Sequence, residues 1–460
     1  MLIKLYLRQP PKPYVIKTFQ LTLIFSFFSL FFYAQNAVPT FDILGGKDRV
    51  TVKFKLINNL VILPLKVNGD ELNFILDSGV NSNIIFNLSS NDTLALYNLR
   101  KINLQGLGND GPVEAYYSTK NTFSVRTLNG SNQNMFIING RLYDLSTKLG
   151  INVHGVIGYE IFKNFVVKIN YDYQELEFFK KGALSKRKLR SYYPMDVSFR
   201  NNKPYVDMNI IIGPDDLSIP VNLLVDSGGG DALWLFENDK KNIYVPDLNS
   251  EQYLGQGLNG NIYGKRSRVN RAVIGKYTLK LTNVAYPDDL SIANAKKDTL
   301  RNGSIGGDFL RRFHVIFDYS SSKIYFKRNR QYKKKFNNNL SGMEVVYDGK
   351  ELVENWELDF GYDSSLSSGN TELLQIEKLL NYSFKPNYKV HAILKGSPAY
   401  IAGLRVGDQL LKIGKKSCFD LKLEDVNGYF LKPKNKLKIT YLRNSEEYIT
   451  TLKLVEIYPN

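Results

Sequence analysis

The stretch Phe74-Ile75-Leu76-Asp77-Ser78-Gly79 has a second copy in the chain, Leu223-Leu224-Val225-Asp226-Ser227-Gly228. In both copies an apolar run ends at an Asp-Ser-Gly tripeptide. The two aspartates are 149 residues apart, and a step of 148 carries Gly155-Val156-Ile157-Gly158 onto Gly303-Ser304-Ile305-Gly306. The step of 149 also relates two sets of glycines, Gly106, Gly108 and Gly111 in the first half and Gly255, Gly257 and Gly260 in the second. Landmarks that recur at one spacing indicate an internal duplication, so each half supplies one carboxylate to a shared feature.

The sequence between these landmarks is typical of β-strands. Alternating apolar positions and turn residues predict a mainly β chain, with each half closing on a short helix and a strand hairpin. The predicted strands are 52–56, 62–67, 166–171 and 175–179 in the first half, and 205–210, 221–225, 315–319 and 323–326 in the second. The predicted helices are 159–164 and 308–312. We therefore expect two lobes of similar architecture.

From about residue 341 the turn residues follow a different pattern. Ser397 is suited to cap a short helix that has Pro398 at its first position, and Gly403 stands where the helix should end. A turn at Gly407-Asp408 then leads into a predicted strand over 409–413. This segment is expected to be a third domain.

The paired aspartates suggest a specific chemistry. A carboxylate at the end of an apolar strand is desolvated, which disfavours its charged form. If an approximate two-fold axis brings Asp77 and Asp226 face to face, the two share a proton. One carboxylate then activates a water molecule and the other, protonated, donates to a substrate carbonyl. Ser78 and Ser227 can hydrogen-bond across the junction of the halves, and Gly79 and Gly228 let backbone amides approach the carboxylates.

The glycine sets also match the G-x-G-x-x-G pattern of dinucleotide-binding proteins. Neither set opens an amphipathic helix directly after a strand, which is the context that such a site needs, so no cofactor is predicted. Glycine-rich hairpin tips, one from each half, are instead expected to cover a cleft as mobile flaps. Tyr116 and Tyr117 follow the first tip and are read as strand aromatics, with contact to substrate as the alternative.

Other hydrolytic chemistries lack the necessary residues. The chain has three histidines and one cysteine, Cys418, and contains neither H-E-x-x-H nor G-x-S-x-G. No metal site and no serine nucleophile are therefore predicted.

The N-terminal segment and the charge point to the cell envelope. Basic residues precede an uncharged apolar stretch over 19–33, which predicts a secretory signal over 1–34, with an uncleaved membrane anchor as the alternative. The net charge is +17, and basic runs occur at 180–181, 186–190 and 327–335. These runs fall between the candidate domains and are read as solvated linkers. No nucleic-acid motif accompanies them, so no nucleic-acid partner is predicted, and contact with an anionic envelope surface is the alternative.

Together these motifs resemble the retropepsin-like and pepsin-like aspartic proteases, and in particular the bacterial members that carry two lobes and a PDZ domain in one chain. The resemblance implies two pseudo-symmetric β-barrel lobes with the Ile-Gly landmarks packed behind the catalytic loops. It also implies a small β-barrel PDZ domain with short helices that binds a peptide. The predicted divisions are a signal peptide (1–34), lobe 1 (35–190), lobe 2 (191–330), a basic linker (331–342) and a PDZ domain (343–460).

The resemblance implies an exported aspartic endopeptidase with Asp77 and Asp226 as catalytic residues, acting on protein or peptide substrates that the PDZ domain binds or positions. The second loop departs from the family pattern, because it continues as Gly229-Gly230-Asp231. Asp231 adds a third carboxylate near the pair if its side chain turns inward. The alternative is therefore an inactive scaffold of the same fold that binds peptides through its PDZ domain.

Overall fold

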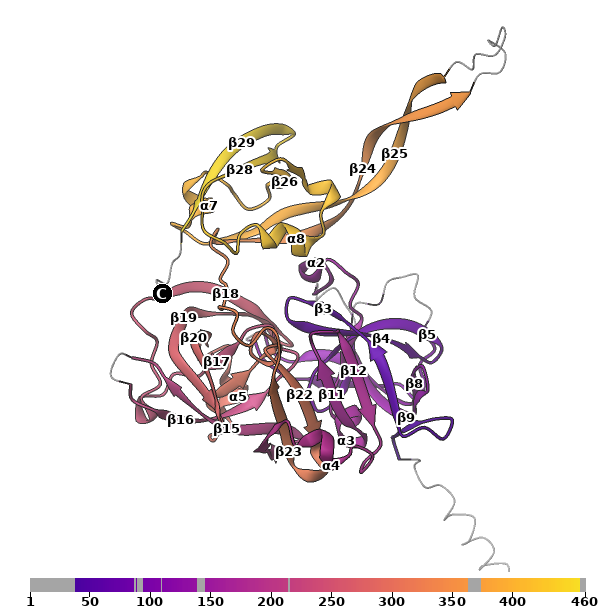
Figure 1. Cartoon of the computed structure of the whole chain (residues 1–460), viewed down its shortest axis with the longest axis vertical. Helices are drawn as coiled ribbons and strands as arrows, with labels where there is room; N and C mark the ends of the chain where they lie inside the picture. The colour runs from indigo at the N-terminus through magenta and orange to yellow at the C-terminus, as the bar shows by residue number, and fades with distance from the viewer. Residues whose placement is uncertain are drawn as a thin grey trace, which may run out of the picture. The chain divides into compact units, whose positions relative to one another are not determined.

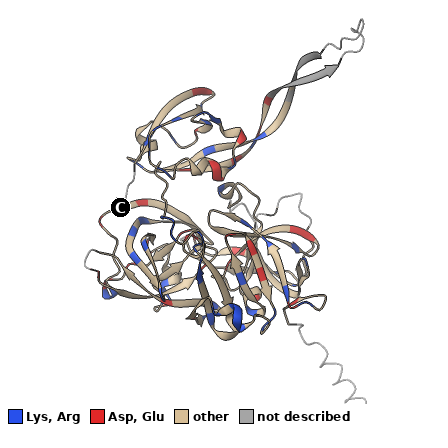
Figure 2. Ribbon diagram, in the orientation of Figure 1, with Lys and Arg blue, Asp and Glu red and all other residues tan. Residues whose placement is uncertain are grey.

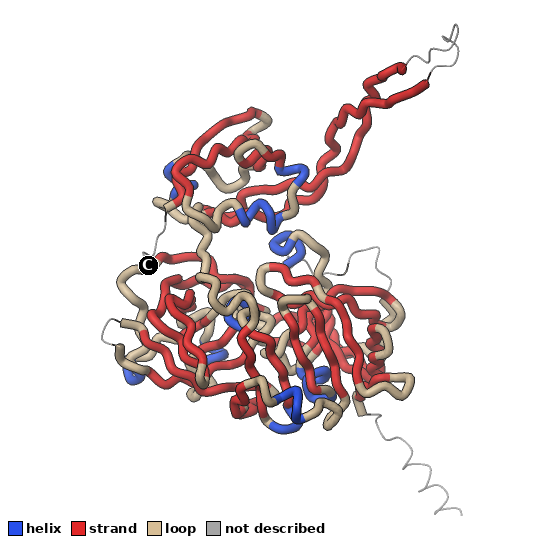
Figure 3. Tube along the Cα trace, viewed as in Figure 1, coloured by secondary structure: helices blue, strands red, loops and turns tan. Residues whose placement is uncertain are grey.

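The computed structural model describes residues 38–86, 88, 94–108, 110–138, 145–213, 216–362 and 374–455. The predicted signal peptide lies outside these residues. Within them, strands dominate and the helices are short (Figure 3). None of the described helices is long and apolar enough to cross a membrane.

The first lobe is a barrel of six strands. Its sheet runs β9-β6-β10-β5-β4-β8, and β8 pairs again with β9, which closes the ring. Buried positions alternate with less buried ones, as in β9, where Gln133, Met135 and Ile137 are buried. The predicted strand 52–56 is two strands, β2 and β3, separated by the buried Phe54. The elements of this lobe are β1 (Thr40–Ile43), β2 (Arg49–Lys53), β3 (Lys55–Ile57), β4 (Leu60–Val67), β5 (Asp70–Leu76), β6 (Asn83–Ile85), β7 (Arg100–Leu104), β8 (Val113–Val125), β9 (Leu128–Ile138), α2 (Leu145–Leu149), β10 (Gly155–Ile157), α3 (Tyr159–Asn164), β11 (Val166–Asn170), β12 (Glu175–Phe179) and α4 (Lys186–Leu189).

The second lobe repeats this barrel strand for strand. Its sheet runs β15-β16-β21-β17-β20-β19, and β19 pairs again with β15. The elements are β13 (Tyr193–Asp196), β14 (Ser198–Arg200), β15 (Lys203–Ile211), β16 (Ile219–Val225), β17 (Leu233–Leu235), β18 (Ser250–Gly257), β19 (Gly260–Ile274), β20 (Tyr277–Pro287), α5 (Ala293–Lys296), β21 (Gly303–Ile305), α6 (Gly307–Leu310), β22 (Phe313–Asp318) and β23 (Lys323–Arg328), with 3₁₀ turns at Asp239–Lys241 and Tyr319–Ser321. The predicted mainly β class with two pseudo-symmetric barrels is confirmed.

A third sheet joins the lobes. It runs β13-β23-β22-β11-β12-β2, so both lobes contribute strands to it (Figure 1). The two lobes meet where β11 pairs antiparallel with β22, with Ile169 opposite Val315. Buried residues of both lobes, including Ile169 and Val315, form one continuous hydrophobic core. The two lobes are therefore held in a fixed position relative to each other.

The C-terminal domain has a separate core. Leu340, Leu410, Cys418 and Phe430 are among its buried residues. Its helix α7 begins as the sequence predicts, because the Ser397 hydroxyl accepts from the Tyr400 amide at 3.3 Å, and Gly403 has φ of +81°. Its elements are β24 (Met343–Tyr362), β25 (Leu374–Ile393), α7 (Pro398–Ile401), β26 (Gln409–Ile413), β27 (Lys416–Ser417), α8 (Leu423–Gly428), β28 (Lys434–Arg443) and β29 (Glu446–Leu454), with a 3₁₀ turn at Cys418–Asp420.

Two of the basic runs that the sequence suggested as solvated linkers form regular structure or pack against the lobes. The run at 186–190 forms α4, which is blue in Figure 2. In the predicted linker 331–342, Phe336 is buried in the core of the lobes, and its ring lies 3.5 Å from the Arg312 guanidinium carbon. Arg312 also donates to the carbonyl oxygen of Lys334. Only the short stretch between Phe336 and Leu340 thus separates the two cores.

Candidate active site

The two Asp-Ser-Gly loops have the same backbone support. Asp77 follows β5, and its amide donates to the Ile157 carbonyl of β10 at 2.9 Å. Asp226 follows β16, and its amide donates to the Ile305 carbonyl of β21 at the same distance. The landmarks that end in Ile157-Gly158 and Ile305-Gly306 therefore lie behind the loops, as the resemblance implies. The departure at Gly229-Gly230-Asp231 leaves this support of the second loop intact.

The serines of the two loops bind each other's backbone. The Ser78 hydroxyl donates to the Val225 carbonyl, and the Ser227 hydroxyl donates to the Leu76 carbonyl, both at 2.7 Å. Each hydroxyl also accepts from the other serine's amide, at 3.0 and 3.1 Å. Both serines are 1% exposed. Four buried hydrogen bonds thus fix one loop against the other, which confirms the predicted contact across the junction.

The glycines of the two loops bring the carboxylates together. The Gly79 amide donates to Asp77 Oδ1 at 2.7 Å, and the Gly228 amide donates to Asp226 Oδ1 at 3.1 Å. A Cβ at Gly79 would lie 2.9 Å from Asp226 Cγ, and a Cβ at Gly228 would collide with the Asp77 carboxyl group. Each glycine therefore leaves room for the aspartate of the opposite lobe.

Asp77 is held in a state that favours its protonated form. It is 9% exposed. Burial and the neighbouring charge of Asp226, with which it shares a hydrogen bond, raise its pKa well above the ordinary value, although the Gly79 amide acts in the opposite direction. Two adjacent carboxyl groups of which one keeps its proton supply both an acid and a base.

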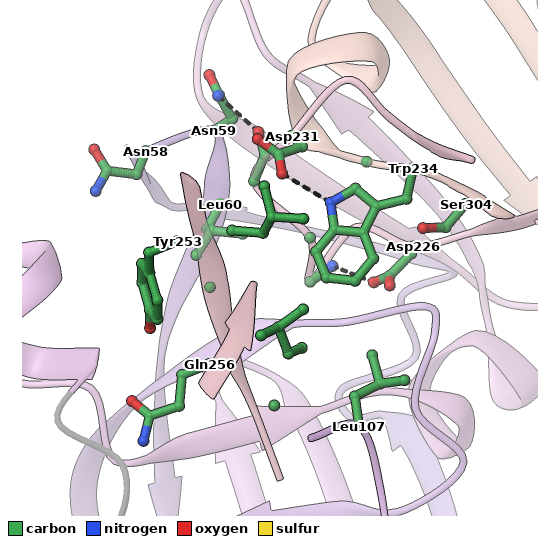
Figure 4. A pocket seen from close by; sticks show the side chains of 18 of the residues that line it. Asn58, Asn59, Leu60, Leu107, Asp226, Asp231, Trp234, Tyr253, Gln256 and Ser304 are labelled. Carbon is green, nitrogen blue, oxygen red and sulfur yellow. Dashed lines mark hydrogen bonds between the residues drawn. The ribbon is translucent and has the colours of Figure 1, made fainter. Parts of the chain in front are cut away.

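Asp77 and Asp226 line a cavity between the two Asp-Ser-Gly loops and the flaps, and Asp231 lines it as well. Asp231 is nevertheless not a free third carboxylate. It accepts from the Trp234 indole nitrogen at 2.7 Å (Figure 4). It also accepts from the Arg266 guanidinium group. Arg266 belongs to β19, so this ion pair connects the second Asp-Ser-Gly loop to the second glycine-rich hairpin. Asp231 is therefore a positioning residue in this structure.

The predicted flaps meet at their tips. The first comprises residues 105–108 and 110–112 between β7 and β8, and the second is the turn between β18 and β19. The Asn259 amide donates to the Leu107 carbonyl at 2.7 Å, and the Asp110 amide donates to the Asn259 carbonyl at 2.7 Å. The Asn259 side chain also accepts from the Gly106 amide and donates to the Gly111 carbonyl.

Glycine is required at the flap tips for two physical reasons. Gly108 and Gly260 have φ of +109° and +107°, where residues with a side chain are strained. Gly257 ends β18, and a Cβ there would collide with the Leu107 carbonyl of the other flap. Gly255 lies at a register shift within β18 and lines the cavity. All six predicted flap glycines thus lie in the two hairpin tips or beside them.

The two predicted strand aromatics lie outside the cavity, whereas two cations that the sequence did not indicate line it. Tyr116 packs against the hydrophobic core and the Tyr117 ring lies 5.2 Å from the Phe136 ring, and neither lines the cavity. Lys203 and Arg301 do line the cavity next to Asp226, and the motifs gave no sign of them. In the described part of the chain, no three His, Cys, Asp or Glu side chains are placed to hold a metal ion.

Comparisons with known proteins identify a domain family for the C-terminal part of the chain. Residues 389–440 match the family model of the PDZ domain. Among curated proteins, no sequence matches the chain. Among solved structures, the chain is similar to the aspartic proteinase from Irpex lacteus, with a TM-score of 0.40 and 12% identity, over 62% of this chain and 99% of that chain. The C-terminal domain is thus a PDZ domain over the matched residues.

Proposed function

We propose that the chain is an exported aspartic endopeptidase that hydrolyses peptide bonds with Asp77 and Asp226. The observation that supports this most is the carboxyl pair itself. The two loops, related by an approximate two-fold axis, hold it together, and burial and the charge of Asp226 raise the pKa of Asp77. The basic and then apolar sequence of 1–34 supports export.

The geometry supports a mechanism without a covalent intermediate. The ionised carboxylate takes a proton from a water molecule, and the protonated carboxyl donates its proton to the oxygen of the scissile carbonyl. The water oxygen bonds to the carbonyl carbon and gives a tetrahedral diol. The carboxyl group that took the proton from water then donates it to the nitrogen, and the carbon–nitrogen bond breaks. The other carboxylate takes a proton from one diol hydroxyl, so that an acid and an amine are released and the pair again holds one proton.

Cleavage of a mixed peptide library tests this proposal. We expect cleavage that a peptidic aspartic-protease inhibitor blocks and that a serine-protease inhibitor and a metal chelator leave unchanged. No cleavage at any pH between about 3 and 8, with the protein folded, would favour the inactive peptide-binding scaffold instead.

The PDZ domain is proposed to position substrates, because PDZ domains bind peptides in an extended form beside a strand. Its core is separate from that of the lobes, and the boundary lies between Phe336 and Leu340. Truncation after Asn338 is therefore expected to leave kcat on short peptides within about two-fold and to raise the apparent KM for protein substrates about ten-fold or more.

The measurement compares kcat and KM of the full chain and the truncated chain on one short peptide and on a protein that contains the same cleavage sequence. Circular dichroism first establishes that the truncated chain is folded. Equal loss of kcat on both substrates would mean that the PDZ domain completes the active site.

A further inference from the structure

The two lobes differ at one pair of equivalent positions beside the carboxylates. In lobe 1, Ile62 pairs with Ile75, and continuation of that register places Leu60 opposite Asp77. In lobe 2, Tyr205 pairs with Leu224, and the same continuation places Lys203 opposite Asp226. Each residue begins its strand after an Asn-Asn turn with positive φ. The pseudo-symmetry therefore puts a leucine on one side of the carboxyl pair and a lysine on the other.

Lys203 is a half-buried cation that has no ion-pair partner among the described residues. Its side chain lines the cavity, as do those of Tyr205 and Asp226 on the same face. Burial and the charge of Arg301 lower its pKa, while Asp226 and Asp77 act in the opposite direction. The charges of both carboxylates thus act on the Lys203 ammonium group, but it forms an ion pair with neither of them.

Arg301 provides a second cation at the same wall. It is 9% exposed, its Nε donates to the Gly303 carbonyl at 3.1 Å, and its guanidinium carbon lies 5.2 Å from the centre of the Phe236 ring. These contacts hold the guanidinium group in place and leave its two terminal nitrogens without a hydrogen-bond partner in the described structure. The neighbouring Arg200 differs, because its guanidinium group already donates hydrogen bonds to Asp298 Oδ2 at 2.7 Å and to Asn222 Oδ1 at 2.8 Å.

The equivalent wall of lobe 1 is apolar. Leu60, Ile75 and Phe86 belong to one small hydrophobic cluster, and each also lines the cavity. Because the approximate two-fold axis passes between the carboxylates, a scissile bond centred on them would have these two walls on opposite sides. One side suits an apolar side chain and the other suits an anion.

We propose that Lys203 and Arg301 form an anion-binding subsite, so that the enzyme prefers an acidic side chain on one side of the scissile bond and a large apolar side chain on the other. This inference rests on the proposed peptidase function. A substrate carboxylate would fill the hydrogen-bonding capacity that both cations leave open. Unpaired partly buried charges are costly, so binding of an anion there should be favourable.

Matched peptides test the subsite. Starting from a sequence that the library identifies as cleaved, a glutamate and its neutral isostere glutamine are placed in turn at each position flanking the scissile bond. At one of these positions we expect the kcat/KM ratio of the Glu peptide to the Gln peptide to be about ten-fold or more, which is the usual effect of one hydrogen bond to a charged group.

The substitution Lys203→Met removes the charge and keeps most of the side-chain volume. It should reduce the ratio of kcat/KM for the Glu peptide to kcat/KM for the Gln peptide to about one, independently of any change in the absolute rate. The control Lys280→Met removes an equal charge from an exposed site on β20 outside the cavity and should keep the wild-type ratio. A wild-type ratio near one at every position, or a ratio that Lys203→Met leaves unchanged, would overturn the inference.

Binding measurements separate this inference from the proposed function. The Asp77→Asn variant should bind the fluorescent Glu peptide about ten-fold more tightly than the Gln peptide, and the double variant Asp77→Asn/Lys203→Met should bind both equally. If no peptide is cleaved but this difference in binding is found, the peptidase proposal fails and the subsite remains. If peptides are cleaved without any preference for glutamate, the subsite fails alone.

Discussion

Replacement of Asp77 or Asp226 by asparagine is expected to lower kcat for peptide hydrolysis about 1,000-fold or more. Asparagine keeps the shape of the side chain but can neither take a proton from water nor share one with its neighbour. Each substitution also removes one of two adjacent carboxyl groups, so neither should reduce the thermal stability of the lobes. The measurement is steady-state hydrolysis of the best library peptide, together with the unfolding temperature.

The control is Asp196→Asn, because the Asp196 side chain is 93% exposed and pairs only with Lys323 at the surface. It should keep the wild-type kcat. Retention of more than about a tenth of the wild-type kcat by either Asp77→Asn or Asp226→Asn would mean that the pair does not perform the chemistry.

Substitution of Ser78 or Ser227 by alanine is expected to have the largest effect on stability. Each hydroxyl donates to a carbonyl and accepts from an amide of the other loop, and both partners are buried at the junction of the lobes. Removal of one hydroxyl leaves a buried carbonyl and a buried amide unsatisfied, which costs about 3 kcal/mol. The unfolding temperature should fall by about 5 °C or more.

Calorimetry of both variants tests this expectation, and Ser191→Ala is the control, because Ser191 is exposed and its hydroxyl makes only a 3.5 Å contact with Lys188. Activity should fall together with stability, since the same four bonds fix the distance between the carboxylates. Unchanged unfolding temperatures in both variants would show that the loops are held together by other contacts.

Much of the site is predictable from the sequence because the duplication repeats its local signals. The Asp-Ser-Gly copies place Asp77 and Asp226 at strand ends, and the shared spacing identifies which landmarks belong behind them. The flap glycines can also be predicted from the sequence. Gly108 has a positive φ and Gly257 is approached closely by the backbone of the other flap, and both situations require glycine. The helix α3 also begins and ends at the predicted residues, between Gly158 and Phe165.

The remaining features depend on pairing between residues that are distant in the sequence. No local pattern indicates that the hairpins 166–179 and 313–328 join in one sheet, because the choice of a neighbouring strand is made by packing. Asp231 was foreseen as a third carboxylate near the pair, but its partner Arg266 lies 35 residues away on another strand. The equivalence of Lys203 and Leu60 comes from strand pairing, because the step of 149 residues that relates the aspartates does not carry Leu60 onto Lys203.

The pH dependence of kcat/KM on one cleaved peptide tests most directly whether the carboxyl pair shares a proton. Activity requires one protonated and one ionised group, so the rate should fall at low pH, where both groups are protonated, and again at high pH, where Asp77 loses its proton. Because burial and Asp226 raise the pKa of Asp77, the fall at high pH should lie well above 3.8, the ordinary value for an aspartate. The account therefore predicts a bell-shaped profile with both limbs, whereas a rate that rises through neutral pH to a plateau near pH 9 would contradict it.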